Sequence, residues 1–147
     1  MRIEKTVTVK APLQRAWEVL LDPAAVAACV PGVERIEPVD ATHFVVTLNV
    51  KVGIVRARFK IHVAVTETRP PHYLRSEGRG EEAGLTSSLR QSTELELREL
   101  GPSETELRVA TDVEVFGALG TFGYSVMKGK ADRMWEEFAA NLQTRIE

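Results

Sequence analysis

Few side chains in this sequence have the types and the spacing that catalysis requires. The three histidines, His43, His62 and His72, fall on the polar faces of predicted strands or beside turns, and no two of them have the spacing of metal ligands. Cys29 is the single cysteine, and no neighbour in the sequence would activate its thiol, so we expect a buried and inert side chain. One cysteine also excludes an internal disulfide framework and a site built from several thiolates. The sequence therefore predicts neither catalytic nor metal-binding residues.

Two other groups of residues suggest chemistry at first sight. Gly117, Gly120 and Gly123 lack the spacing of a phosphate-binding loop, and close packing of a helix on a sheet explains them more simply. Asp112 and Glu114 alternate with apolar residues, which places both carboxylates on the water-exposed face of a strand. The alternation thus offers no ionisable group on the apolar face, and this disfavours acid–base catalysis inside the protein.

A set of polar residues points instead to the recognition of a ligand. In the segment "LTSSLRQSTELEL" (85–97), alternation places Ser87, Gln91 and Thr93 on the apolar side, and Thr111 and Ser76 join them from neighbouring strands. The leucines of the same segment share that side: Leu85, Leu89, Leu95 and Leu97. A dry core rarely tolerates several unpaired polar groups, because each costs roughly 1–3 kcal/mol. These groups must therefore bond one another, or meet water or the polar end of a ligand.

The first third of the chain predicts a strand and two short helices. Residues 2–9 alternate as a strand, and Pro12 precedes "LQRAWEVLL" (13–21), whose apolar residues have helical spacing. Asp22 and Pro23 then start a second short helix, 23–29, which Pro31 and Gly32 stop. This second helix is too short for a membrane and too apolar for water, so we expect it to plug one end of the structure.

The rest of the chain predicts a run of about six antiparallel strands followed by one long helix. "HFVVTLNV" (43–50) and "IVRARFKIHVAV" (54–65) alternate around a tight hairpin, and further strands are expected at 72–80, 85–97 and 104–115. From about Leu119 to Ile146, apolar residues recur at the spacing of a long amphipathic helix. This order predicts an α+β fold in a single domain, 1–147, whose antiparallel sheet wraps around the C-terminal helix.

Such a fold leaves a wedge between sheet and helix, and we expect a cavity there. The candidate ligand-binding residues are Phe44, Val46, Leu48, Phe59, Ile61 and Val63 from strands, Phe122, Val126 and Met134 from the helix, and the polar Ser87, Gln91 and Thr111. The open alternative is that these residues simply fill a core, together with Trp17, Trp135 and the methionines.

Composition limits the classes of partner. A net charge of −2 argues against a nucleic-acid-binding protein, and no apolar run approaches the roughly 20 residues that span a bilayer. No secretory signal is visible, so we expect a cytoplasmic protein. The outward Arg56, Arg58 and Lys60 form a basic stripe, which is either a solvated face or a docking surface for an acidic partner or an anionic bilayer.

Four stretches carry a resemblance to a known family. These are "VKAPLQRAWEVLLDPAAVAACVPGVERI" (9–36), "VKVGIVRARFKIHVAVTETRPP" (50–71), "GRGEEAGLTSS" (78–88) and "VEVFGALGTFG" (113–123). In this order they resemble the CoxG family of carbon monoxide dehydrogenase subunits, which belongs to the START-like, or SRPBCC, helix-grip superfamily. The resemblance implies about seven antiparallel strands that grip a C-terminal helix over a hydrophobic cavity. It also implies a link to molybdenum-containing hydroxylases, for which maturation, membrane recruitment and quinone binding are the roles attached to the family.

We therefore expect a non-catalytic protein that binds a hydrophobic small molecule, either lipid- or quinone-like, and requires no cofactor. Its expected partner is a molybdenum hydroxylase subunit of the carbon monoxide dehydrogenase type. A polyketide cyclase- or hydrolase-like enzyme that uses the same cavity is the alternative, and an assembly factor whose cavity is incidental is a third hypothesis. Peripheral contact with the inner face of the membrane and a homodimer stay open.

Overall fold

The computed structural model describes residues 1–84 and 86–147; Leu85, which we expected on the apolar side of a strand, lies outside the described residues. The elements follow one another as β1 (Arg2–Val9), α1 (Leu13–Leu21), α2 (Pro23–Cys29), β2 (Val33–Pro38), β3 (His43–Val52), β4 (Val55–Arg69), β5 (Tyr73–Glu82), β6 (Ser87–Gly101), β7 (Glu104–Gly117), the 3-10 helix η1 (Leu119–Phe122) and α3 (Tyr124–Ile146).

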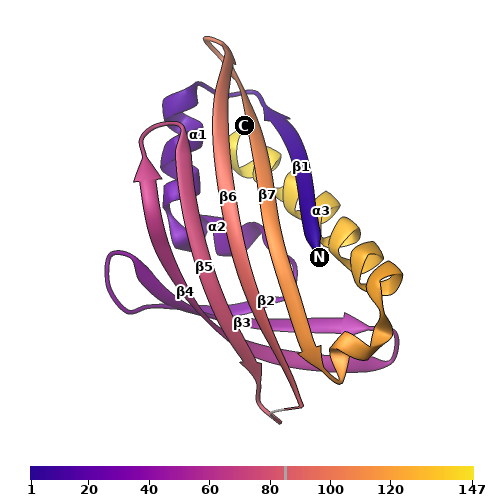
Figure 1. Ribbon diagram of the computed structural model, residues 1–147. Coiled ribbons are helices and arrows are strands. Elements are labelled where there is room, and N and C mark those ends of the chain that lie inside the picture. The colour runs from indigo at the N-terminus through magenta and orange to yellow at the C-terminus, as the bar shows by residue number, and fades with distance from the viewer. Residues whose placement is uncertain (85) are drawn as a thin grey trace.

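The strands form one seven-stranded antiparallel sheet in the order β1-β7-β6-β5-β4-β3-β2. Figure 1 shows that the sheet twists strongly, so that β3 crosses behind the long strands β5, β6 and β7 while α3 runs beside β1. The predicted sheet, the two short helices after β1 and the long C-terminal helix are confirmed.

The register confirms which residues face inward. Val46 pairs with Ile61, and Thr93 pairs with both Ser76 and Thr111, so these side chains share the concave face. A slip of one residue would have turned all of them outward, and the apolar alternation in the sequence prevents that slip.

Local sequence explains the helix boundaries. Pro23 occupies the first turn of α2, and the Asp22 carboxylate accepts a hydrogen bond from the backbone N–H of Ala24 at 3.1 Å. The C-terminal helix begins later than predicted, because Gly123 adopts a φ of +84° and separates η1 from α3. Strand β2 was not individually predicted; it is short, and its exposed positions do not alternate with buried ones.

The apolar interior is divided into two separate cores. The first, which we call the helix core, joins α1, α2 and the end of α3 to the sheet, with Trp17, Leu107 and Leu142 fully packed. The second, the hairpin core, surrounds the β3–β4 hairpin and η1, with Phe59 and Leu119 buried. The expected plug is confirmed, since α1 and α2 close the end of the wedge at which α3 finishes.

Candidate ligand-binding site

A belt of polar side chains crosses the concave face between the two cores. It consists of Gln91 and Thr93 on β6 and Thr111 on β7, and on β6 it lies between Leu89, which packs against the hairpin core, and Leu95, which packs against the helix core. All three are half-buried, although they lie on central strands and point away from the convex face. Their accessible surface must therefore face the space between sheet and helix, which is not sealed.

Assigning the hydroxyl and amide hydrogens shows which hydrogen-bond donors of the polar belt remain free. The Thr93 hydroxyl donates to the Gln91 Oε1, so the 2.8 Å contact between the Thr93 and Thr111 hydroxyls must be donated by Thr111. The side-chain amide Nε2 of Gln91 then keeps two N–H donors that find no acceptor among the described residues. The polar groups of the belt thus partly bond one another, which is one of the two alternatives stated from the sequence. The Gln91 amide remains as a hydrogen-bond donor for water or a ligand.

The middle of α3 lies opposite the belt and is also incompletely packed. Met127 packs against the hairpin core and Phe138 against the helix core. Between them Ala131, Met134 and Trp135 are half-buried and belong to neither core. Trp135 instead stacks at a tilt on Phe138, with ring centroids 5.5 Å apart. The helix thus spans the gap between the cores without filling it.

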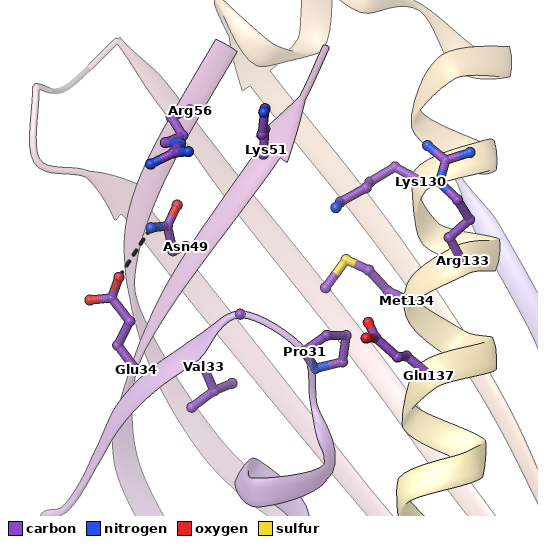
Figure 2. Close-up of a pocket in the computed structure, with 11 residues that line it drawn as sticks. Pro31, Val33, Glu34, Asn49, Lys51, Arg56, Lys130, Arg133, Met134 and Glu137 are labelled. Atoms are coloured by element: carbon purple, nitrogen blue, oxygen red, sulfur yellow. Dashed lines mark hydrogen bonds between the residues drawn. The ribbon is translucent and has the colours of Figure 1, made fainter. Parts of the chain in front are cut away.

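A pocket of about 600 Å³ opens between α3 and the end of β3. Its lining comes from the loop after α2, from β2, β3 and β4, and from α3: Pro31, Gly32, Val33, Glu34, Asn49, Lys51, Arg56, Lys130, Arg133, Met134 and Glu137. Figure 2 shows Met134 directed into the space from the helix, with Pro31 below it and Lys51 and Arg56 on the opposite wall.

The pocket exists because β2 begins too late to cover the end of β3. Val33, the first residue of β2, pairs with Leu48, so the last four residues of β3 have no partner in strand β2, and the last three lie beyond the turn at Gly32. Gly32 makes the turn into β2 with a φ of +89°, and its carbonyl accepts from the Asn49 backbone N–H at 2.8 Å. A Cβ at Gly32 would clash with the Asn49 carbonyl oxygen, so only glycine fits this corner.

Ten of the twelve predicted site residues fall into three groups. Phe59 and Ile61 are buried in the hairpin core. Four other predicted residues are half-buried and pack against this core: Val46, Leu48, Val63 and Phe122. Phe44 is half-buried on the concave face, and Gln91 and Thr111 form part of the polar belt. Of the predicted residues, Met134 alone lines the pocket, whose other walls were not identified from the sequence.

Two predicted residues lie where a ligand in this space would not meet them. Val126 is 45% exposed at the start of α3, because the break at Gly123 rotates it away from the face that Phe122 occupies. Ser87 is buried, and its hydroxyl accepts the backbone N–H of Leu119 at 3.0 Å, which ties η1 to the sheet.

Ionisable side chains face inward, contrary to the expectation that none would: Lys5 on β1, and Glu82, which pairs with the buried Phe59. Lys5 lies on the same face of β1 as Ile3 and Val7, and its ammonium group lies 3.0 Å from the Asp132 carboxylate on α3. The hydrogen bond from Lys5, and then that from Lys128, lowers the pKa of Asp132. Because this pair joins the β1 edge to the helix, it closes one side of the wedge opposite the pocket.

Other reactive groups lie outside this space. His43, His62 and Asp112 are exposed. Cys29 is 2% exposed in the helix core, and burial raises the pKa of its thiol. Among residues 1–84 and 86–147, no group of three acidic, histidine or cysteine side chains is arranged to hold a metal, and no described helix is long and apolar enough to cross a bilayer.

Comparison with known proteins agrees with this architecture. The family model of CoxG, a subunit of carbon monoxide dehydrogenase, matches residues 6–147. A conserved protein from Geobacillus kaustophilus superposes with a TM-score of 0.90 at 19% identity, over 99% of this chain and 95% of that one. A START superfamily protein from Mycobacterium smegmatis gives 0.76 at 19% identity, over 99% and 96%.

An aromatase/cyclase, Zhui from Streptomyces sp. R1128, shares the fold with a TM-score of 0.70 at 21% identity, over 99% of this chain and 93% of that one. A search of curated proteins found no match. The structural neighbours confirm the START-like helix-grip fold, and the family model covers nearly the whole chain. This protein therefore belongs to the CoxG family of carbon monoxide dehydrogenase subunits.

Proposed function

We propose that this protein is a non-catalytic binding protein that holds a lipid- or quinone-like molecule between the concave face of the sheet and α3. The observation that carries the proposal is the polar belt, whose Gln91 amide presents free N–H donors amid half-buried apolar side chains. A mostly apolar space with a few placed polar groups is the usual profile of a small-molecule site.

The chemistry of the belt favours a ligand that carries a carbonyl oxygen. The free donors of Gln91 complement an acceptor, and the half-buried Val46, Leu48 and Val63 provide an apolar surface for the rest of the molecule. A quinone or the carboxyl end of a lipid has both features. The pocket beside Met134 provides an entrance from solvent.

The enzyme alternative has less support. A cyclase or hydrolase would need an ionisable group over the bound molecule. Lys5 points in that direction, but Asp132 neutralises it at the seam between β1 and α3. The likeness to an aromatase/cyclase is a likeness of fold and identifies no catalytic residue in this chain.

Native mass spectrometry of freshly purified protein, followed by organic extraction, tests the proposal directly. We expect a discrete excess mass that proves to be an isoprenoid quinone or a lipid. A bare protein mass, together with a melting curve that neither a short-chain isoprenoid quinone nor palmitate moves, would refute the proposal, because a bound ligand must raise the melting temperature by mass action.

Two variants then locate the site. Ala131→Phe adds a ring to the middle of α3 and should abolish the ligand-induced shift, whereas Ala140→Phe, exposed on the same helix, should leave it unchanged. Gln91→Leu removes the free donors while leaving the Thr93–Thr111 bond. It should weaken quinone binding about fivefold to tenfold, which corresponds to one hydrogen bond of roughly 1–1.5 kcal/mol. Equal binding by Gln91→Leu and the parent protein would show that the belt does not contact the ligand.

The family suggests in which enzyme system this protein acts. We propose that this protein acts as an accessory, maturation or membrane-recruitment factor for a molybdenum hydroxylase of the carbon monoxide dehydrogenase type. Co-purification of such an enzyme with the tagged protein from its own host is the expected result. Its absence, with ligand binding intact, would separate the binding function from this partner.

A further inference from the structure

The pocket between α3 and the end of β3 is lined by two pairs of basic side chains, one pair on each side. Lys51 and Arg56 are direct cross-strand partners on β3 and β4. Lys130 and Arg133 lie three residues apart on α3 and face them across the space, as Figure 2 shows. We call these four residues the basic walls. Sheet and helix thus present positive charge to the same space.

Each of these pairs is unfavourable in the protein alone. Like charges destabilise an antiparallel sheet when they lie directly opposite each other, and a helix when they lie about one turn apart. None of the four residues forms an ion pair within residues 1–84 and 86–147. By contrast, Arg58, on the same face of β4 as Arg56, lies 3.2 Å from the Glu34 carboxylate. The basic walls therefore lack the counter-charge that their neighbour has.

The pocket stays positive after its acidic side chains are counted. Glu34 and Glu137 also line it. The Glu34 carboxylate already accepts hydrogen bonds from Arg58 at 3.2 Å and from Asn49 at 3.1 Å, and Arg58 lies outside the lining. The four basic side chains then face one carboxylate, that of Glu137, which leaves a local excess of three positive charges. Because the whole chain carries a net charge of −2, this excess is a local property of the pocket.

We propose that this pocket binds a soluble organic phosphate, whose phosphate group lies between the basic walls. A phosphate ester carries a charge of about −1.5 to −2 near pH 7 and has three acceptor oxygens. Arginine and lysine are its usual ligands. An anion in this position would turn the repulsion within each basic pair into attraction to a shared partner. Because the walls face each other, a small anion can contact both of them, whereas a flat anionic surface cannot.

The size and the apolar part of the pocket indicate that the phosphate belongs to a larger molecule. The volume of about 600 Å³ is within the range of roughly 300–1,000 Å³ that is typical of small-molecule sites. Pro31, Val33 and Met134 contribute apolar surface, and Figure 2 shows Met134 directed into the space with Pro31 below it. We expect this surface to contact a hydrocarbon chain or a ring attached to the phosphate.

Such a ligand would also cover the entrance to the space between sheet and helix. A bound phosphate ester would then slow the uptake and the release of a lipid- or quinone-like molecule. This consequence rests on the proposed function, whereas the phosphate site itself does not.

Isothermal titration calorimetry of the full chain at low ionic strength tests the phosphate site. The probes are inorganic phosphate, pyrophosphate, and octyl phosphate below its micelle concentration. We expect all three to bind, and added salt to weaken their binding, because screening reduces the attraction between phosphate and basic side chains. Octyl phosphate should bind roughly tenfold more tightly than inorganic phosphate, because its chain buries apolar surface against Met134.

Variants of each wall show whether the anion lies between them. Lys51→Gln/Arg56→Gln changes the sheet side, and a second double variant, Lys130→Gln/Arg133→Gln, changes the helix side. Each should weaken the binding of pyrophosphate and octyl phosphate roughly tenfold, because it removes charge-assisted hydrogen bonds to phosphate. Met134→Ala should weaken octyl phosphate about threefold and leave pyrophosphate unchanged. Since like-charge repulsion is relieved, neither wall variant should lower the urea midpoint, which separates lost binding from lost folding.

Lys10→Gln/Arg15→Gln is the matched control, because it removes the same charge from exposed residues near α1. It should bind all three probes like the parent protein. The proposal is overturned if none of the probes binds, if the control loses as much affinity as the wall variants, or if only phosphatidylglycerol vesicles bind, which would assign the basic walls to a bilayer. A loss of octyl phosphate binding in Gln91→Leu without any loss in the wall variants would also overturn it, because the phosphate would then lie at the polar belt.

Discussion

The Ala131→Phe substitution distinguishes an open interior from a filled one by the sign of its effect on stability. Ala131 lies on the face of α3 shared by Met127 and Phe138, midway between the residues that enter the two cores. Full burial of a phenylalanine side chain stabilises by about 1.5–3 kcal/mol. In a half-buried position about half of that, ~1 kcal/mol, is available. The lower helix propensity of phenylalanine removes about 0.5 kcal/mol. An open interior therefore predicts a free energy of unfolding about 0.5 kcal/mol higher than that of the parent protein.

A filled interior predicts the opposite sign, because overpacking a core costs about 1–3 kcal/mol. Two further variants provide reference values for the change in the free energy of unfolding at a buried and at an exposed position. Ala16→Phe places the ring in the helix core, at a residue with 0% exposure, and should destabilise by at least that amount. Ala140→Phe is exposed and should lose only the propensity difference, about 0.5 kcal/mol.

The assay is urea unfolding followed by tryptophan fluorescence, since Trp17 is packed in the helix core and reports its opening. The midpoint is compared among variants whose transitions have the same slope. If Ala131→Phe proved as destabilising as Ala16→Phe, the space between the cores would be filled, and the reasoning that places a ligand there would fail.

Three further predictions concern single groups. Asp132→Asn should reduce the loss of stability that the parent protein shows below about pH 4. Lys5 lowers the pKa of the Asp132 carboxylate in the folded state. The ionised carboxylate therefore stabilises the fold above its pKa in the unfolded chain, and this stabilisation is lost as the pH falls through its pKa in the folded protein. Identical melting temperatures of variant and parent protein across that range would contradict it. Gly80→Ala should lower the free energy of unfolding by about 1 kcal/mol, because its Cβ would lie 2.8 Å from the Ile61 Cγ1; an unchanged urea midpoint would show that Ile61 moves freely into open space. Cys29 should react with a thiol reagent far more slowly in buffer than in urea, and equal rates would mean that α2 does not stay packed.

The sequence predicted the strands and their inward faces because a period of two residues is local information. Arg58, Lys60 and His62 alternate with Phe59 and Ile61 so regularly that only one register of β4 buries the apolar set. The same reasoning placed Gln91, Thr93 and Thr111 on one face, and the structure shows them bonded in a row.

The pocket could not be predicted in this way, because it depends on where elements end. The opening exists because β2 starts at Val33 and leaves the end of β3 uncovered, and neither fact follows from the periodicity of either strand. The error at Val126 has a similar origin. A continuous helix would place Phe122 and Val126 on one face, but the left-handed φ of Gly123 interrupts the helix between them.

The two ends of α3 are held unequally, and this bears on how a ligand would enter. At its C-terminal end, Leu142 and Ile146 are buried in the helix core, and the Asn141 side chain donates to the Cys29 carbonyl at 3.0 Å. At its other end the helix starts from Gly123 without a side-chain cap, and Met127 provides its contact with the hairpin core. Local opening costs least where few buried contacts must be broken. The start of α3 is therefore the segment whose displacement would widen the pocket at the lowest free energy.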